Sequence, residues 1–220
     1  MKINISCFCG ANIPFEYDEE ADIDENSGHL TKMMEGVFMS VNCPSCGKKH
    51  KPEFRITVIW KSKNLRMEVI PELERGEYYL AAFNNPARDK KIKTSIPNTA
   101  KLSAQTIIGF PEMADRLAVI KDGFEPVVIE TLKSFLLTKA AENYPEKEIN
   151  AWYHNSSSSG IEFHLDGIRK GEVAVMRIPL DTYEKTLSDY RKHPKKDIYK
   201  SLYAGSYLSV QNLLRPDIIK

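Results

Sequence analysis

The four cysteines of this sequence lie in two close pairs, and this spacing limits how the N-terminal part can fold. The first pair is in Cys7-Phe8-Cys9-Gly10 and the second is in Cys43-Pro44-Ser45-Cys46-Gly47. Structural zinc takes four ligands in a tetrahedron, and each pair can supply two thiolates from one tight turn. The glycine after each pair permits the positive φ that such a turn requires. The sequence therefore predicts a zinc ribbon with one structural Zn²⁺ per chain, held by Cys7, Cys9, Cys43 and Cys46.

Other roles for these cysteines fit the sequence less well. His50 follows the second pair and could replace one cysteine as a ligand, although a surface histidine beside the turn is the commoner arrangement. Four small buried thiols without a metal are another alternative, because cysteine packs like a small apolar residue. A redox dithiol of the thioredoxin kind needs a helix that begins at its cysteines. Gly47 and Pro52 make such a helix improbable, so the redox alternative is rejected.

Length and charge restrict the class of protein. The chain has 220 residues, of which 42% are hydrophobic and 28% are charged, and it can bury a sizeable core. Its net charge of +1 gives no overall field that would draw it to nucleic acid or to an anionic membrane. The N-terminus is too short and polar for a signal peptide, and no apolar run has the length of a membrane span. Because cysteines that bind metal suit a reducing compartment, we expect a cytoplasmic protein.

Alternating apolar residues predict a sheet after the cysteine pairs. Phe54 to Trp60 and Leu65 to Ile70 both alternate, and a short polar turn separates them, as in a hairpin. Ile3 to Ser6 and Asn12 to Tyr17 are predicted as short strands around the first pair, and Glu77 to Phe83 as a further strand. We therefore expect an antiparallel sheet that extends from the zinc ribbon.

Two helices are predicted after a polar loop from Asn84 to Ser103. The first lies between Pro111, a residue type favoured at the first helical position, and Gly123, a type favoured just after the last. The second runs from Pro126 to near Tyr144 and carries apolar residues along one side. Both apolar stripes are expected to pack into the core.

A smaller C-terminal lobe is predicted beyond these helices. The serine-rich run from Asn155 to Gly160 predicts a flexible joint. Ile161 to Asp166 and Glu172 to Ile178 predict a hairpin, and a helix and short helical turns follow, the last of them from Tyr207 to Leu214. The predicted fold is α+β in two parts, which are residues 1–145 and 150–220.

Several of these stretches together resemble the CpXC family, a group of prokaryotic proteins of unknown activity named for paired cysteine motifs. The resemblance covers Ile3 to about Thr138. It rests on the two cysteine turns, on the β-rich stretch that ends near Val69-Ile70-Pro71, and on Met113 to Phe124 before the long helix. It implies that the four cysteines bind one metal ion, expected to be zinc, in a protein without an established reaction. The turn Cys7-Phe8-Cys9 departs from the family's Cys-Pro-x-Cys pattern.

The sequence predicts no catalytic residues at the metal. A catalytic zinc keeps one coordination position open, and four thiolates leave none. Glu162, His164 and Asp166 alternate along one predicted strand and so project to one face, where they could serve acid–base chemistry or a second metal. The solvent-facing side of a half-buried strand has the same pattern. An enzyme with its site in the C-terminal lobe is therefore one alternative function.

Basic clusters suggest another alternative, a zinc ribbon associated with nucleic acid. Lysines and arginines near Trp60, Tyr78 and Tyr79 could neutralise phosphates while the rings stack on bases. The clusters are Lys48-Lys49-His50-Lys51, Arg88 with Lys90, Lys91 and Lys93, and Arg191-Lys192-His193 with Lys195 and Lys196. Against this alternative, 30 acidic residues nearly balance 31 basic ones. We expect instead a structural zinc-binding protein whose partner is another protein.

Overall fold

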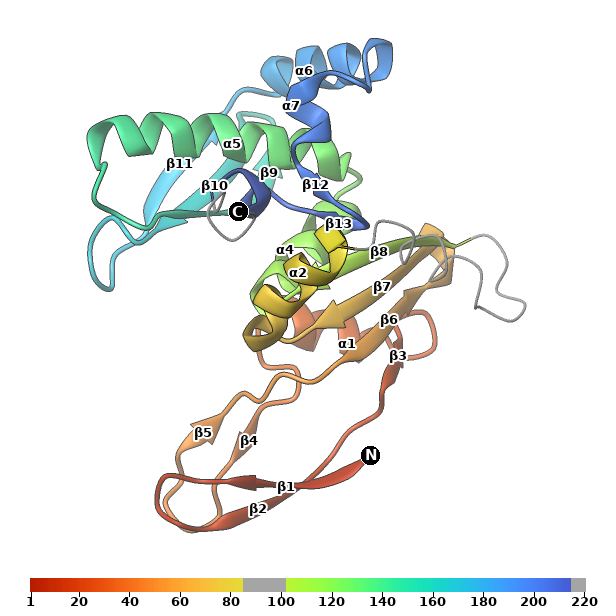
Figure 1. Cartoon of the computed structure of the whole chain (residues 1–220), viewed down its shortest axis with the longest axis vertical. Coiled ribbons are helices and arrows are strands. Elements are labelled where there is room, and N and C mark those ends of the chain that lie inside the picture. The colour runs from red at the N-terminus through yellow and green to blue at the C-terminus, as the bar shows by residue number, and fades with distance from the viewer. Residues whose placement is uncertain (85–101, 215–220) are drawn as a thin grey trace. The chain divides into compact units, whose positions relative to one another are not determined.

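A computed structural model of the chain describes residues 1–84 and 102–214 (Figure 1). The described residues form two compact units, the first within Met1–Tyr78 and Ala87–Ala114, the second within Tyr79–Pro86 and Asp115–Lys220. The predicted polar loop and its basic cluster Arg88, Lys90, Lys91 and Lys93 lie mostly or wholly outside the described residues. Among the described residues, the chain passes from the first unit to the second after Tyr78 and again after Ala114, whereas the sequence predicted a boundary between residues 145 and 150.

Two short hairpins form the N-terminal part of the first unit, here called the cysteine ribbon. Strands β1 (Lys2–Ser6) and β2 (Asn12–Glu16) pair antiparallel, which confirms the two strands predicted around the first cysteine pair. Strands β4 (Val41–Asn42) and β5 (Lys49–His50) also pair antiparallel. Figure 1 shows the two hairpins alongside each other, so that their turns lie at the same end.

Four strands of the first unit form a mixed sheet in the order β8-β7-β6-β3. They are β3 (Glu20–Asp22), β6 (Ile56–Trp60), β7 (Leu65–Ile70) and β8 (Ser103–Ile108). The β6–β7 hairpin is antiparallel, as predicted. However, β3 pairs parallel with β6 and β8 pairs parallel with β7, so the prediction of a purely antiparallel sheet is wrong. Long connections separate both parallel pairs in sequence, and such connections are what parallel pairing requires.

Helices occupy two of the long connections. Helix α1 (Ser27–Met34) begins after Asn26, whose side chain accepts a hydrogen bond from the Gly28 N–H. Helix α2 (Arg75–Asn84) covers the segment predicted as a strand from Glu77 to Phe83, so that prediction is wrong. The paired tyrosines favoured a strand, but Leu80-Ala81-Ala82 has high helix propensity, and the helical conformation forms.

The two long helices form as predicted. Helix α4 (Phe110–Lys121) ends before Gly123, whose φ of +81° places it in the left-handed region typical of a helix C-terminus. Helix α5 (Pro126–Asn143) begins with proline at its first position. Its buried residues face several directions, which is expected for a helix in the centre of a core.

The second unit contains a three-stranded antiparallel sheet in the order β11-β10-β9, and α5 packs on it (Figure 1). Its strands are β9 (Asn150–Ser157), β10 (Gly160–Asp166) and β11 (Ala174–Ile178). The serine-rich run predicted as a flexible joint is instead part of the β9–β10 hairpin, in which only Ser158 and Ser159 form the turn. The position after this turn requires glycine, because Gly160 has φ +136° and a Cβ would collide with the Ile178 carbonyl oxygen.

The chain ends in short elements. They are α6 (Leu180–Lys192), α7 (Asp197–Lys200), β12 (Tyr203–Ala204), β13 (Tyr207–Leu208) and α8 (Gln211–Leu214). The segment from Tyr207 to Leu214 is therefore helical only in its last part, which corrects the prediction. With helices and sheets in both units, the predicted α+β class is confirmed. No helix within residues 1–84 and 102–214 has the length and apolar character needed to cross a bilayer.

A buried ionic network fastens α4 and α5 to the rest of the second unit. Lys133 Nζ lies 2.5 Å from Asp115 Oδ2 and 2.8 Å from Glu130 Oε1, and all three side chains are at most 5% exposed. Asp115 also accepts a hydrogen bond from the Tyr153 N–H, and Glu130 accepts one from the Val210 N–H. Burial disfavours a charged lysine, but the two carboxylates outweigh it and raise the pKa of Lys133.

Candidate metal centre

The structure brings the four predicted cysteines together at the turns of the cysteine ribbon. Their sulfur atoms all lie within 4.8 Å of one another. Cys7 Sγ is 3.6 Å from Cys46 Sγ, and Cys9 Sγ is 3.7 Å from Cys43 Sγ. Four sulfurs at about 2.3 Å from a tetrahedral zinc ion would be separated by about 3.8 Å. The cluster therefore fits a tetrahedral metal ion, and the cysteines are not joined in disulfides.

The two turns have the same construction despite their different lengths. The Gly10 N–H donates to the Cys7 carbonyl, and the Gly47 N–H donates to the Cys43 carbonyl, both at 2.9 Å. The two glycines have φ values of +86° and +71°, which few other residues adopt without strain. The hydrogen bond of the first turn therefore spans two intervening residues and that of the second turn spans three. Both sulfurs of the first turn still point at the second turn.

The surroundings shift the pKa values of two of the thiols in opposite directions. N–H groups of Cys46 and Ser45 favour the Cys43 thiolate and, against the effect of burial, lower the pKa of Cys43 to about 6. The Cys9 N–H also favours the Cys7 thiolate, but burial and the other three sulfurs outweigh it and raise the pKa of Cys7 to about 12. Without a cation, four thiolates this close together would repel one another. A bound divalent cation would remove that repulsion.

His50 contacts the cluster from the side. Its Nε2 lies 3.2 Å from Cys7 Sγ, and its ring stacks on Phe8 with centroids 6.2 Å apart. At that distance Nε2 can donate a hydrogen bond to a Cys7 thiolate that is already a ligand, as groups around metal sites commonly do. The position of His50 thus suits a supporting role beside four sulfur ligands.

The cysteine ribbon has little hydrophobic core of its own. Its buried apolar cluster consists of Cys7, Cys43 and a single aliphatic side chain, Ile13, and the partly buried Ile5, Ala11 and Val41 pack around them. Such a cluster is too small to hold two hairpins together in water. The sulfur site is therefore the main feature of the described residues that can hold the ribbon together.

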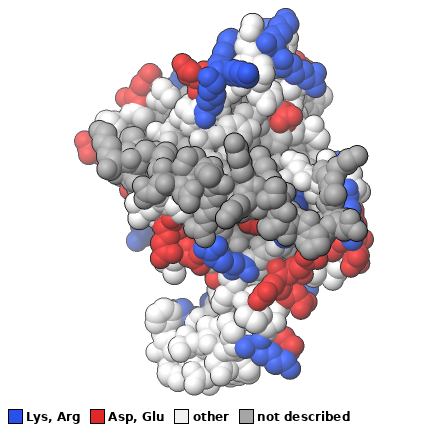
Figure 2. All heavy atoms as spheres, turned by 45° about the vertical axis from the view of Figure 1, so that its right-hand side comes forward, with Lys and Arg blue, Asp and Glu red and all other residues white. Residues whose placement is uncertain are grey.

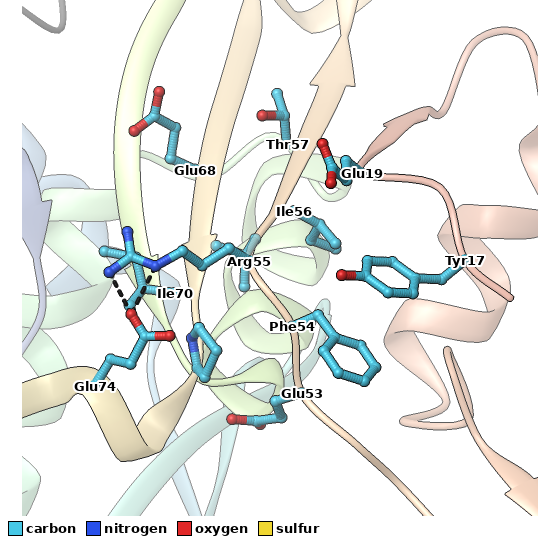
Figure 3. A pocket seen from close by; sticks show the side chains of 12 residues that line it. Tyr17, Glu19, Glu53, Phe54, Arg55, Ile56, Thr57, Glu68, Ile70 and Glu74 are labelled. Carbon is cyan, nitrogen blue, oxygen red and sulfur yellow. Dashed lines mark hydrogen bonds and ion pairs between the residues drawn. The ribbon is translucent and has the colours of Figure 1, made fainter. Parts of the chain in front are cut away.

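A hollow of about 440 Å³ lies elsewhere in the first unit, beside β6 and β7 (Figure 3). The Tyr17 and Phe54 rings stack at one side of it, with centroids 4.4 Å apart, and Arg55 pairs with Glu74 at the other. Glu53 accepts hydrogen bonds from two backbone N–H groups, those of Glu72 and Phe110. These polar groups are used to hold the surrounding segments in place.

The structure separates the trio Glu162, His164 and Asp166. His164 Nε2 lies 3.2 Å from Glu162 Oε1, but Asp166 accepts hydrogen bonds from Asn150 and Trp152 instead. His154, which the sequence did not indicate, joins Glu162 and His164 in a second group of potential metal ligands. The sequence analysis gave no signal for it, because β9, the strand that carries His154, was not predicted.

The basic clusters within the described residues are exposed, but the stacking rings predicted with them are not. Trp60 is 7% exposed and Tyr79 is 1% exposed, so neither can stack on a base, and Tyr78 is half-buried. Figure 2 shows lysine and arginine side chains gathered over α6 and α7, where Arg191, Lys192, Lys195 and Lys196 lie. The face of the cysteine ribbon seen in the same view is largely uncharged.

The fold and the site define an α+β protein with a four-cysteine cluster that could bind a metal. The family model described as CpXC protein matches residues 5–133, and this chain belongs to the CpXC family, as its motifs suggested. The chain is also similar to an uncharacterized protein of Treponema pallidum (strain Nichols). The two are 26% identical over 216 residues, which cover 96% of this chain and 98% of that protein. No solved structure matches the chain.

Proposed function

We propose that Cys7, Cys9, Cys43 and Cys46 bind one structural Zn²⁺ ion, and that the protein works as a cytoplasmic protein-interaction module. The observation that supports the metal is the convergence of four sulfurs from two turns to within 4.8 Å. Thiolates in tetrahedral geometry favour zinc among the common divalent ions. Four of them fill the coordination shell, so the ion would hold the ribbon together and activate no water.

The exposed surface near the cluster supports binding to a protein. Phe8 lies between the first two ligands and is 88% exposed, and Lys48 Nζ lies 4.2 Å from the centre of its ring. Exposed aromatic side chains on a fixed turn are typical anchors in protein interfaces. A metal in the cluster would fix the turn and so present Phe8 in one position.

Metal analysis of Cys46→Ser tests the zinc proposal. Wild-type protein purified under reducing conditions should contain zinc, and the variant should contain one zinc ion per chain fewer because one of four thiolates is missing. Ser45→Ala is the matched control, since it changes the neighbouring residue of the same turn and removes no ligand. Equal zinc content in wild type and Cys46→Ser would contradict the proposal.

Co-purification from the native host, with nuclease treatment, tests the interaction module. A protein partner should remain bound to zinc-loaded wild type after nuclease treatment and should be lost with Phe8→Ser, which leaves the folded core unchanged. A partner retained equally by Phe8→Ser, or turnover of a substrate by the purified protein, would argue against this function.

Nucleic acid remains the second candidate, since Lys48, Lys49 and Lys51 are exposed on the ribbon. Mobility-shift assays at two salt concentrations would detect it. A steep loss of binding with salt, abolished when these three lysines are changed to alanine, would favour nucleic acid over protein.

A further inference from the structure

A second group of potential ligands lies on the outer face of the β9–β10–β11 sheet. We call it the histidine–glutamate cluster, and it consists of His154, Glu162 and His164. One possible ligand atom from each residue lies within 4.8 Å of the other two. Glu162 Oε1 faces both imidazoles, 3.2 Å from His164 Nε2 and 3.9 Å from His154 Nε2.

The pairing of β9 with β10 brings His154 to this cluster, because Trp152 pairs with His164 and His154 lies two residues further along β9, next to Glu162. Phe163 pairs with Tyr153, but the next residue, Glu162, pairs with Asn155, so the β9 strand contains one extra residue. His154 is that residue, and it has no direct partner across the hairpin.

Arg177 on β11 fixes the carboxylate of Glu162 and leaves one oxygen for the histidines. Its Nε and Nη2 donate to Glu162 Oε2 at 3.0 and 2.9 Å. These bonds, with a smaller contribution from His164, lower the pKa of Glu162 and keep its carboxylate charged. Oε1 is thus a fixed anionic ligand atom, supported by a second residue as metal-binding carboxylates commonly are.

We propose that His154, Glu162 and His164 form a second metal site, which takes a divalent transition-metal ion of the Zn²⁺ type. Two imidazoles and one carboxylate form a common ligand set for such ions. The side chains of His154, His164 and Glu162 are 49%, 29% and 14% exposed, so solvent can occupy the remaining coordination positions. The site lies outside residues 5–133, which the family model matches, and it shares no residue with the cysteine cluster.

The imidazole rings must rearrange when the ion binds. Their centroids are 3.8 Å apart with an angle of 18° between the ring planes. Each nitrogen lone pair lies in its own ring plane, so two nearly parallel stacked rings cannot both point at one ion. The half-exposed His154 ring can turn with little loss of packing, whereas His164 is held against Glu162. Binding therefore opens the stack by rotation of His154.

Equilibrium dialysis of the full chain against Zn²⁺ under reducing conditions tests this site. Wild type should bind one more ion than a variant that combines His154→Ala with His164→Ala. His193→Ala is the matched control, because it removes an exposed histidine outside the cluster and should bind as many ions as wild type. The cysteines are the same in all three proteins, so any metal that they bind cancels in the comparison.

Histidine ring signals in the NMR spectrum provide a second readout. Addition of Zn²⁺ should shift the His154 and His164 signals and remove the contacts between the two rings, and leave the His193 signals in place. Equal metal content in wild type and the double variant would overturn the proposal. So would a stack that persists at saturating Zn²⁺.

Discussion

Replacing Lys133 by methionine tests the buried ionic network of the second unit. This network links α4 and α5 to the backbone of Tyr153 and Val210. Lys133 is the cation that lies between Asp115 and Glu130, and the three side chains are at most 5% exposed. Methionine keeps most of the volume and removes the charge. The change therefore leaves two carboxylates close together in the core, and Glu130 keeps the hydrogen bond from the Val210 N–H and the longer 3.5 Å ion pair with Arg116.

The expected loss follows from the burial of the pair. Removing one partner of a buried ion pair destabilises a protein by about 3–5 kcal/mol, because the remaining charge is buried without compensation. For a protein of this size, each kcal/mol lowers the melting temperature by about 2–4 °C. Lys133→Met should therefore lower it by roughly 6–20 °C at neutral pH.

The loss of stability in Lys133→Met should become smaller as the pH falls. Burial already raises the pKa of Asp115, and the loss of Lys133 raises it further above the value in the unfolded chain. A carboxyl whose pKa is raised by folding binds its proton more tightly in the folded state. Its stabilising effect is complete below the unfolded pKa and is lost as the pH rises through the folded pKa. The wild type and the variant should therefore differ most near pH 7 and least near pH 4.

Scanning calorimetry at these two pH values, at a fixed zinc concentration, provides the measurement. Lys139→Met is the control on the same helix, because Lys139 is exposed and its replacement should change the stability by less than about 0.5 kcal/mol. A Lys133→Met variant that melts within 2 °C of wild type at pH 7, or whose deficit grows as the pH falls, would refute this reasoning.

Two further predictions concern a glycine and a surface carboxylate. Gly167→Ala should destabilise the second unit by roughly 1–3 kcal/mol or more, because Gly167 has φ +90° and a Cβ would collide with the Glu148 carbonyl. The control is Gly76→Ala, at a helical position where a Cβ meets no other atom. It should leave the midpoint of urea unfolding unchanged or raise it. A Gly167→Ala midpoint equal to wild type would contradict this. Lys61 lies 2.6 Å from Asp22 and lowers the pKa of Asp22 below its ordinary 3.8, so this pair stabilises above that pH and the effect fades as the pH falls. Lys61→Met should thus lower the urea midpoint more at pH 7 than at pH 3, and an equal or larger effect at pH 3 would exclude the pair as the cause.

Sequence patterns predicted the elements that form from interactions between residues close in sequence. The β6–β7 hairpin was visible from alternation, and α4 and α5 from Pro111, Gly123 and Pro126, because each depends on residues close in sequence. Strand β8 was missed, since it forms by parallel pairing with β7 across a long connection. Its short polar start, Ser103-Ala104-Gln105, gives no strand signal until a partner strand is present.

The four-cysteine cluster could be predicted because cysteines paired at such a short spacing are rare. The pairs Cys7–Cys9 and Cys43–Cys46 have few structural uses besides a metal, and their convergence needs only two turns. The histidine–glutamate cluster could be predicted only in part. Glu162 and His164 share a strand face, but His154 joins them only through the pairing of β9 with β10, which no single strand reveals.

Zinc K-edge X-ray absorption of the reduced protein, carrying one zinc per chain, tests the central claim most directly. The variant with His154→Ala and His164→Ala should be used, so that the zinc is confined to the cysteine ribbon. We predict four sulfur ligands at about 2.3 Å and no nitrogen ligand. Three sulfurs and one nitrogen would make His50 a ligand, and a spectrum of nitrogen and oxygen ligands alone would contradict a zinc site at the cysteines.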